Sequence, residues 1–177
     1  MIKRILYFLL VLFTFVVVSG CDEIKMLFEE DVSDEAVDAG VESVDDLERT
    51  EYFRDGALIH ILEGELNRNN QAVGFHYEGM PGAKGETIDD TETDPNEYGV
   101  YEAEVKVSDV EKTSNNGKSS FFPKDWTAQE VVDGINEAYE AKELLTGNTY
   151  EGLTDEGVVI QMYIDNEGEI ISAFPVY

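Results

Sequence analysis

The chain has a single cysteine, Cys21, among its 177 residues. One cysteine cannot form a disulfide within the chain, so the fold must be held together by core packing alone. Only two histidines are present, His60 and His76, and without a cysteine partner they do not form a recurrent zinc cluster. The sequence also lacks a phosphate-binding glycine loop and the nucleophile elbow of serine hydrolases, which argues against those two enzyme classes.

Basic residues are scarce as well. The chain has 12 Lys and Arg against 39 Asp and Glu, which gives a formal net charge of −27 at pH 7. A surface this acidic repels nucleic acid at long range, and we do not expect DNA as a partner. An acidic surface also suits a protein exposed to high salt, where charge repulsion is screened within a few ångströms. We favour that explanation of the charge.

The first twenty residues are typical of a signal peptide rather than of a folded domain. Lys3 and Arg4 precede an apolar run over 5–18, which is too short to span a bilayer comfortably. The run ends in Val18-Ser19-Gly20-Cys21, which resembles the lipobox of bacterial lipoproteins. The resemblance implies cleavage before Cys21, lipidation of its thiol, and an extracytoplasmic protein anchored to the cell membrane. A plain anchor helix and an ordinary signal peptide are the alternatives.

Residues 21–51 are predicted to form an acidic tether, because their many carboxylates repel one another. The alternative is a helix that docks on the domain through Val37, Val41, Val44 and Leu47, whose spacing fits one helical face. The compact domain is then expected over 52–177, a common size for one domain with a real core.

The pattern of elements predicts an α+β domain with a helical part near its start, antiparallel strands and a C-terminal β-hairpin. Leu58, Leu62 and Leu66 fit one stripe of a helix that Asp55 could cap. Residues 72–77 alternate as a strand, with Val73, Phe75 and Tyr77 on one face and His76 on the other. Residues 79–99 and 108–120 are expected to be loops, on either side of a strand at 100–107.

The second half of the domain carries stronger signals. Thr127-Ala128-Gln129-Glu130 is a capping box, and a helix is predicted from there to about Leu145. A hairpin follows, with strands at 158–164 and 169–176 joined by the turn Asp165-Asn166-Glu167-Gly168.

Four fragments in this order resemble the bacterial branch of the EndoU family of endoribonucleases. They are His60-Ile61-Leu62-Glu63-Gly64-Glu65, Gly74-Phe75-His76-Tyr77-Glu78, Ser119-Ser120-Phe121-Phe122-Pro123-Lys124-Asp125-Trp126 and Ile171-Ser172-Ala173-Phe174-Pro175. The resemblance covers nearly the whole compact domain. It implies RNA as the substrate, cleavage to 2′,3′-cyclic phosphate ends without a required cofactor, and manganese as a candidate stimulant.

The resemblance also implies roles for single residues. His76 is the expected general base and His60 the expected general acid, although the reverse assignment stays open. Two imidazoles suit this chemistry because histidine exchanges protons near neutral pH. Lys118 is the expected cation beside the phosphoryl group, with Lys124 as the fallback, whereas Lys84 is expected to face water.

The base and ribose are expected to contact Ser172 and Phe174, with Ser120 as a further candidate. Phe174 stands where some members of the family have tyrosine, so a phenolic hydrogen bond is lost while ring stacking is kept. This departure weakens the expectation of strict uridine specificity, because the hydroxyl would help to specify uracil.

Two functions follow from these observations. The first is a membrane-tethered endoribonuclease, deployed as a toxin with an immunity partner or as a surface nuclease. The second is a non-catalytic acidic lipoprotein that uses the same scaffold as a binding module. Cleavage of a uridine-containing oligonucleotide that depends on both histidines would separate the two.

Overall fold

The structure is a computed structural model, and it describes residues 41–177. The expected signal peptide, Cys21 and most of the expected tether lie outside the described residues. Among the described residues, no helix has the length and apolar character needed to span a membrane.

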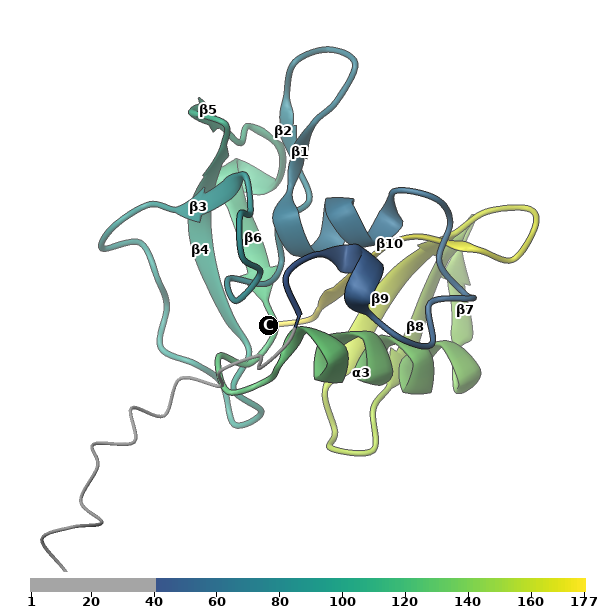
Figure 1. The fold of residues 1–177 in the computed structure, drawn as a ribbon. Coiled ribbons are helices and arrows are strands. Elements are labelled where there is room, and N and C mark those ends of the chain that lie inside the picture. Colours follow the sequence, from purple (N-terminus) through teal and green to yellow (C-terminus); the bar gives the residue numbers. More distant parts are fainter. Residues whose placement is uncertain (1–40) are drawn as a thin grey trace, which may run out of the picture. The chain divides into compact units, whose positions relative to one another are not determined.

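The described part of the chain forms an α+β fold, as predicted, with two larger antiparallel sheets, a two-stranded sheet of β1 and β2, and one α-helix. Figure 1 shows the two larger sheets side by side, with the short helical segment η2 between them. In the first half the elements are η1 (Val44–Asp46), η2 (Ile59–Glu63), β1 (Glu65–Leu66), β2 (Ala72–Val73), β3 (Gly85–Thr87), β4 (Tyr101–Val107) and β5 (Val110–Glu111). In the second half they are η3 (Ser114–Gly117), β6 (Lys118–Phe121), α3 (Ala128–Glu140), β7 (Glu143–Thr146), β8 (Thr149–Leu153), β9 (Val159–Ile164) and β10 (Ile170–Pro175).

The C-terminal sheet has the order β10-β9-β8-β7, and α3 packs against β8 and β9. The β9–β10 hairpin agrees with the prediction. The capping box at the start of α3 is also confirmed, since the Thr127 side chain accepts from the Glu130 backbone and the Glu130 side chain accepts from the Thr127 backbone. Val131, Ile135 and Ala138 are fully buried between the helix and this sheet, so α3 supplies much of the main core.

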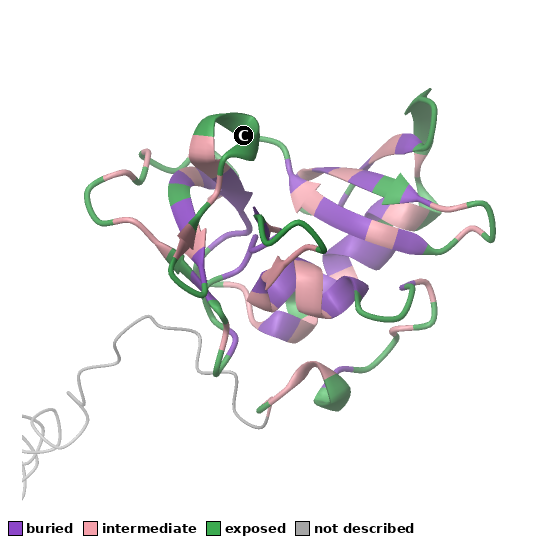
Figure 2. Ribbon diagram, turned by 90° about the horizontal axis from the view of Figure 1, so that it is seen from above, coloured by how far each residue is buried: buried purple, intermediate pink, exposed green. Residues whose placement is uncertain are grey.

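The second sheet is built around β4, which pairs with β3, β5 and β6. Tyr101, Ala103, Val105 and Val107 point to its buried face, as the alternation along this strand predicts. They form a second, smaller core with Ala72, Phe75 and Phe121. Figure 2 shows buried residues along the strands and helical segments, while exposed residues gather in the connections.

The two halves meet where β10 contacts both β6 and η2. Strands from either sheet therefore line one region, and this region holds the candidate site described below.

Three predicted elements are wrong in their extent. The helix after Asp55 is a short π-helix, Ile59–Glu63, because Gly64 adopts a positive φ of 74° and turns the chain into β1, which contains Leu66. The strand predicted at 72–77 ends at Val73, because Gly74 and Phe75 both have positive φ. The helix predicted to reach Leu145 ends at Glu140, and Glu143–Thr146 forms the edge strand β7.

The predicted loops also contain short strands. β3 lies within 79–99, and 108–120 contains β5, η3 and β6. These pieces are short and polar on one side, so their pairing with β4 decides their conformation more than their own sequence does.

The described end of the expected tether packs on the domain. Leu47 is buried in the main core, and Val41 and Val44 pack against it. The Arg49 guanidinium forms an ion pair with Asp133 of α3. Three of the four residues of the alternative docking face therefore contact the domain, through a single 3₁₀ turn at Val44–Asp46 rather than a long helix.

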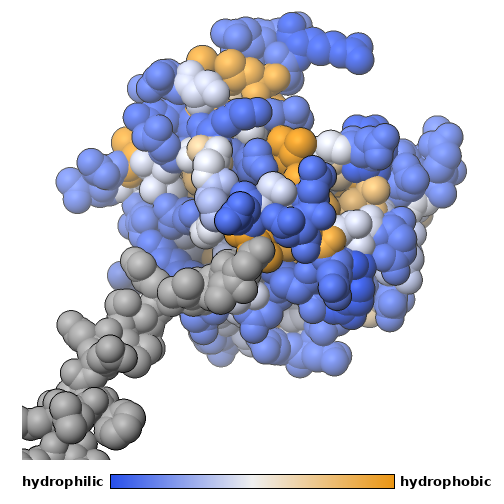
Figure 3. Space-filling view, viewed as in Figure 1, coloured by the Kyte–Doolittle hydropathy of each residue, from blue (hydrophilic) through white to orange (hydrophobic). Residues whose placement is uncertain are grey.

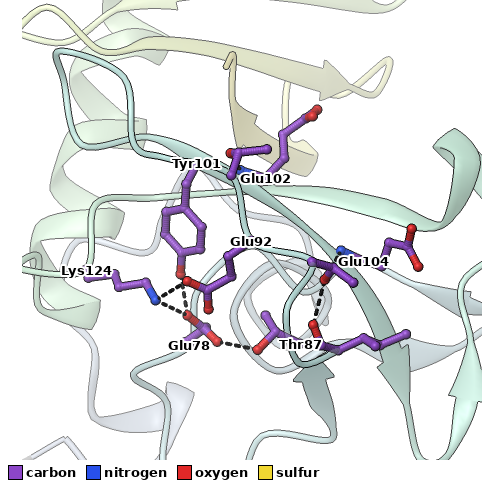
Figure 4. Close-up of polar contacts among 10 residues, drawn as sticks. Glu78, Thr87, Glu92, Tyr101, Glu102, Glu104 and Lys124 are labelled. Carbon is purple, nitrogen blue, oxygen red and sulfur yellow. Dashed lines mark hydrogen bonds and ion pairs between the residues drawn. The ribbon is translucent and has the colours of Figure 1, made fainter.

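A polar cluster lies beside β4 (Figure 4). The Tyr101 hydroxyl donates to Glu78, and the Lys124 ammonium forms ion pairs with both Glu78 and Glu92. Burial, followed by the contact with Glu78, raises the pKa of Tyr101, so this phenol stays protonated and acts as a donor. The cluster links the long 88–100 connection between β3 and β4 to the second sheet.

Candidate active site

His60 belongs to η2, and its side chain is 21% exposed. Its Nδ1 lies 3.1 Å from Oε1 of Glu65, at the start of β1. Because a carboxylate accepts hydrogen bonds, Nδ1 is the protonated nitrogen in this contact. Burial lowers the pKa of His60, and Glu65 opposes that change in part by stabilising the imidazolium.

His76 follows β2 and is 7% exposed. Its Nδ1 lies 2.8 Å from the backbone carbonyl oxygen of Ser120, in β6. A carbonyl can only accept, so Nδ1 donates and Nε2 keeps a lone pair. Burial, with smaller contributions from Lys112 and His60, lowers the pKa of His76 to about 3, so this ring is neutral at ordinary pH.

Backbone hydrogen bonds hold the two histidine segments against each other. The Phe75 N–H donates to the His60 carbonyl at 3.0 Å, and the His76 N–H donates to the Ile61 carbonyl at 2.8 Å. Gly74 makes this approach possible, because a Cβ there would lie 1.9 Å from the His60 carbonyl oxygen. The break in the predicted strand is thus what brings His76 next to His60.

Both histidines line one cleft of about 490 Å³ between the two sheets. All six residues predicted for catalysis or substrate binding line it: His60, His76, Lys118, Ser120, Ser172 and Phe174. The other residues that line it are Val73, Gly74, Lys112, Ser114, Asn115, Ser119, Gln161 and Tyr163.

The predicted lysines differ in their surroundings. Lys118 reaches the cleft, but its Nζ lies 3.2 Å from Oε2 of Glu102, which neutralises part of its charge. Lys124 is held in the polar cluster by Glu78 and Glu92 and does not line the cleft. Lys84 does not line the cleft either.

Lys112 is a cleft lysine that the sequence interpretation missed. Its Nζ donates to Oγ of Ser119 at 2.7 Å and to the Gly74 carbonyl at 3.4 Å. Among the described residues it has no carboxylate partner, and burial lowers its pKa to about 8. Asn115 and Asn116 both have positive φ in η3, and this tight turn folds Lys112 back beside β6. The Asn-Asn-Gly run could have indicated such a turn, and with it the position of Lys112.

The opposite wall of the cleft is aromatic. The Phe174 ring stacks on the His76 imidazole, with centroids 5.3 Å apart and planes inclined by 24°. Tyr163 lies next to Phe174, with ring centroids 6.1 Å apart. The cleft therefore combines two imidazoles, two amines and an aromatic wall, a set of groups that suits a phosphodiester flanked by a base.

The sequence model for the bacterial EndoU nuclease family matches residues 55–177. The chain belongs to this family. The match covers both histidines, the two cleft lysines and the β9–β10 hairpin, so the whole candidate site lies within the EndoU domain.

A protein of Bacillus cereus named "Toxin" is 49% identical to this EndoU chain over 134 residues. The aligned region covers 76% of the chain and 25% of the relative, so the chain spans about a quarter of that protein's length. No solved structure matches the chain.

Proposed function

We propose that this EndoU domain is an endoribonuclease that cleaves RNA by transphosphorylation and leaves 2′,3′-cyclic phosphate ends. The observation that carries the proposal is that His60 and His76 line one cleft, with Nδ1 of each ring held by a fixed acceptor. Nε2 of each ring is then the nitrogen available to exchange a proton with a substrate.

The environments of the two rings favour His76 as the base and His60 as the acid. His76 is neutral over a wide pH range, so its Nε2 can remove the proton of a ribose 2′-hydroxyl. His60 has Glu65 beside it to stabilise the imidazolium, so it is the better donor to the departing 5′-oxygen. The 2′-oxygen then forms a bond to phosphorus while the bond from phosphorus to the 5′-oxygen breaks.

The negative charge that grows on the phosphoryl oxygens needs a cation close by. We propose Lys112 for this role ahead of Lys118. The Lys118 ammonium is paired with Glu102, whereas the Lys112 ammonium has no carboxylate partner within residues 41–177. Ser172 remains the proposed contact to the base and ribose, with a preference for uridine, and Phe174 belongs to the aromatic wall beside it. The buried Ser120 also has a structural role, since its carbonyl orients His76.

The central experiment incubates the purified protein with a short oligoribonucleotide that contains one uridine and analyses the product ends by mass spectrometry. We expect a cyclic phosphate at the uridine and no cleavage when that uridine is 2′-deoxy. His60→Ala and His76→Ala should each lower kcat/KM by roughly 10²–10⁴-fold, the usual contribution of a general acid or base. Tyr98→Ala is the matched control, because Tyr98 is exposed and does not line the cleft.

The lysine assignment is tested with three methionine variants in the same assay. Lys112→Met should cost roughly 10²–10³-fold in kcat, as the loss of one charge-stabilising donor does. Lys118→Met should cost less, and Lys124→Met should leave kcat close to that of the parent protein. A larger loss at Lys118 than at Lys112 would return the role to Lys118.

The competing function is a non-catalytic binding module, which the excess of acidic over basic residues favours. Intact RNA at every salt concentration, with and without manganese, would support it. Cleavage that survives in both histidine variants would instead point to a contaminating nuclease.

We further propose that the protein is held outside the cytoplasm by lipid on Cys21 and that it acts as a toxin with an immunity partner. The toxin role rests on the name of the Bacillus cereus relative. Cys21→Ser should move the protein from the membrane fraction to the soluble fraction. Expression of the chain without residues 1–20 in a bacterial cytoplasm should arrest growth, and His76→Ala should abolish that effect.

A further inference from the structure

The aromatic wall of the cleft is built from the outward face of the β9–β10 hairpin. The register pairs Tyr163 with Ser172 and Gln161 with Phe174, so these four side chains share one face of the sheet. The alternate residues Ile160, Met162 and Ala173 are buried in the core. The family resemblance points to Ser172 and Phe174, whereas Tyr163 and Gln161 are their cross-strand neighbours in this chain.

The Phe174 ring already has a partner. It stacks on the His76 imidazole at 5.3 Å, and its other neighbour in the aromatic wall is Tyr163 at 6.1 Å. A ring in this position holds the imidazole in place and has less free surface for a base. The departure from tyrosine to Phe174 also removes a hydroxyl from this point of the cleft.

Tyr163 has the free ring surface and the hydroxyl that Phe174 lacks. It lines the cleft, 38% of its surface is exposed, and within residues 41–177 no group hydrogen-bonds to its hydroxyl. Gln161, two residues away on β9, also lines the cleft, and its side-chain amide makes no hydrogen bond to any residue within 41–177. An amide offers both a donor and an acceptor, which suits the edge of a pyrimidine.

We infer that Tyr163 is the platform on which the base stacks, and that Phe174 is a positioning residue for His76. The base concerned is that of the nucleotide whose 2′-hydroxyl attacks the phosphorus, because Tyr163, Phe174 and His76 follow one another along the wall and His76 is the proposed general base for that hydroxyl. Gln161 lies close enough on the same face to contact the edge of this base. The inference rests on the proposed function and deepens it.

The test compares two substrates: the dinucleotide UpA, and its analogue in which the uracil is absent but the ribose keeps its 2′-hydroxyl. Tyr163→Ala should lower kcat/KM for UpA by about 5- to 150-fold, the usual effect of losing one stacked base, and should leave the abasic analogue unchanged. Tyr163→Phe should retain most of the activity because the ring is kept. Tyr98→Ala, which removes an exposed tyrosine outside the cleft, is the control.

Phe174→Ala should give a different pattern. It should lower kcat/KM for both substrates, because the His76 ring loses its packing partner. For the same reason it should shift the acidic limb of the plot of kcat/KM against pH. A Tyr163→Ala variant that cleaves UpA like the parent protein would overturn the inference and leave the proposed function intact. So would a Phe174→Ala variant that is impaired on UpA alone.

A binding measurement separates the inference from the proposed function. The ring resonances of Tyr163, assigned by comparison with Tyr163→Phe, should shift on titration with a 2′-fluoro analogue of UpA, which cannot be cleaved. If the parent protein cleaves no RNA, the proposed function fails and this inference fails with it. If RNA is cleaved but the Tyr163 resonances do not move, only the inference fails.

Discussion

The environments of single residues support the proton-transfer roles proposed for the two histidines. The Nδ1–H of His76 donates a hydrogen bond to a backbone carbonyl, whereas the Nδ1–H of His60 donates one to a carboxylate. The carbonyl is neutral, so it orients the ring with little effect on its charge, and burial then keeps His76 unprotonated. Glu65 carries a charge, so it favours the protonated form of His60. In the proposed mechanism, the same residue type therefore serves as base at one position and as acid at the other.

This division predicts an acidic pH optimum. Activity needs His76 neutral, which its pKa of about 3 allows over most of the range, and His60 protonated, which requires a pH below its pKa. The pKa of His60 is lowered from 6.5, so the protonated fraction falls as the pH rises through values below 6.5. Lys112 stays charged below about pH 8 and does not limit activity there. The plot of kcat/KM against pH should therefore peak below pH 6.5, and a peak above pH 7 would contradict the assignment.

Glu65 supplies the second residue-scale prediction. In Glu65→Gln the amide keeps a hydrogen bond to His60 but loses the charge that favours the imidazolium. The alkaline limb of the kcat/KM profile should move to lower pH. Because the Glu65 side chain is half exposed, the loss at the optimum should be modest, roughly 1.5- to 5-fold. Glu63→Gln, two residues earlier at the end of η2, is the matched control. An unchanged alkaline limb in Glu65→Gln would remove Glu65 from the mechanism.

At the scale of elements, the chain bends where a regular strand would have kept the two histidines apart. β2 ends at Val73, and Gly74 and Phe75 both adopt positive φ before His76. These two residues let the chain cross the backbone of η2 at the His60 carbonyl. The cleft therefore depends on a local irregularity, which a period-two pattern cannot reveal.

The elements that were predicted correctly share one property. β4, the start of α3 and the β9–β10 hairpin each have a long periodic pattern, and α3 and the hairpin also have a clear start or turn signal, such as the Thr127 capping box. The elements that were missed or given the wrong extent are short and owe their conformation to distant partners. β7 has four exposed residues and is a strand only because it pairs with β8, so Leu144 and Leu145 looked like the end of a helix.

The residues of the candidate site divide in the same way, into those that a local motif reveals and those whose position depends on distant parts of the chain. The two histidines and Ser172 could be found because short motifs contain them. Lys112 lies outside these motifs, and its signal is the weaker one of the Asn-Asn-Gly run, which indicates the left-handed turn at Asn115 and Asn116. Tyr163 lies in a correctly predicted strand, but only the register of that strand places it opposite Ser172.

A pair of glycine substitutions tests whether the close approach of Gly74 to the His60 carbonyl is required. Gly74→Ala adds a Cβ that would meet the His60 carbonyl oxygen at 1.9 Å, whereas Gly82→Ala, at nearly the same positive φ, meets nothing within 4 Å. Gly82→Ala should cost about 1–2 kcal/mol of unfolding free energy, the usual penalty of a left-handed alanine. Gly74→Ala should cost clearly more in urea unfolding and should also abolish RNA cleavage. Equal costs in the two variants would show that the close approach at Gly74 is not required.

At the scale of the whole molecule, the chain is strongly negative, whereas the charged side chains that line the cleft are lysines. The chain carries a formal net charge of −27, and hydrophilic residues cover most of the face seen in Figure 3. The cleft contains Lys112 and Lys118 but no Asp or Glu among the residues that line it. A polyanionic substrate is thus repelled at a distance and attracted only at the cleft.

This opposition predicts an unusual dependence on salt. The screening length falls from about 30 Å at 0.01 M salt to about 8 Å at 0.15 M, so added salt weakens long-range repulsion before it weakens contacts inside the cleft. The repulsion grows with the number of phosphates outside the cleft, so it acts on a 20-nucleotide RNA far more than on UpA. The ratio of kcat/KM for the long RNA to that for UpA should therefore rise several-fold between these salt concentrations. UpA serves as the internal control for effects of salt on the chemistry. A ratio that falls with salt, as for a nuclease with a basic RNA-binding surface, would show that the exterior charge does not govern access to the cleft.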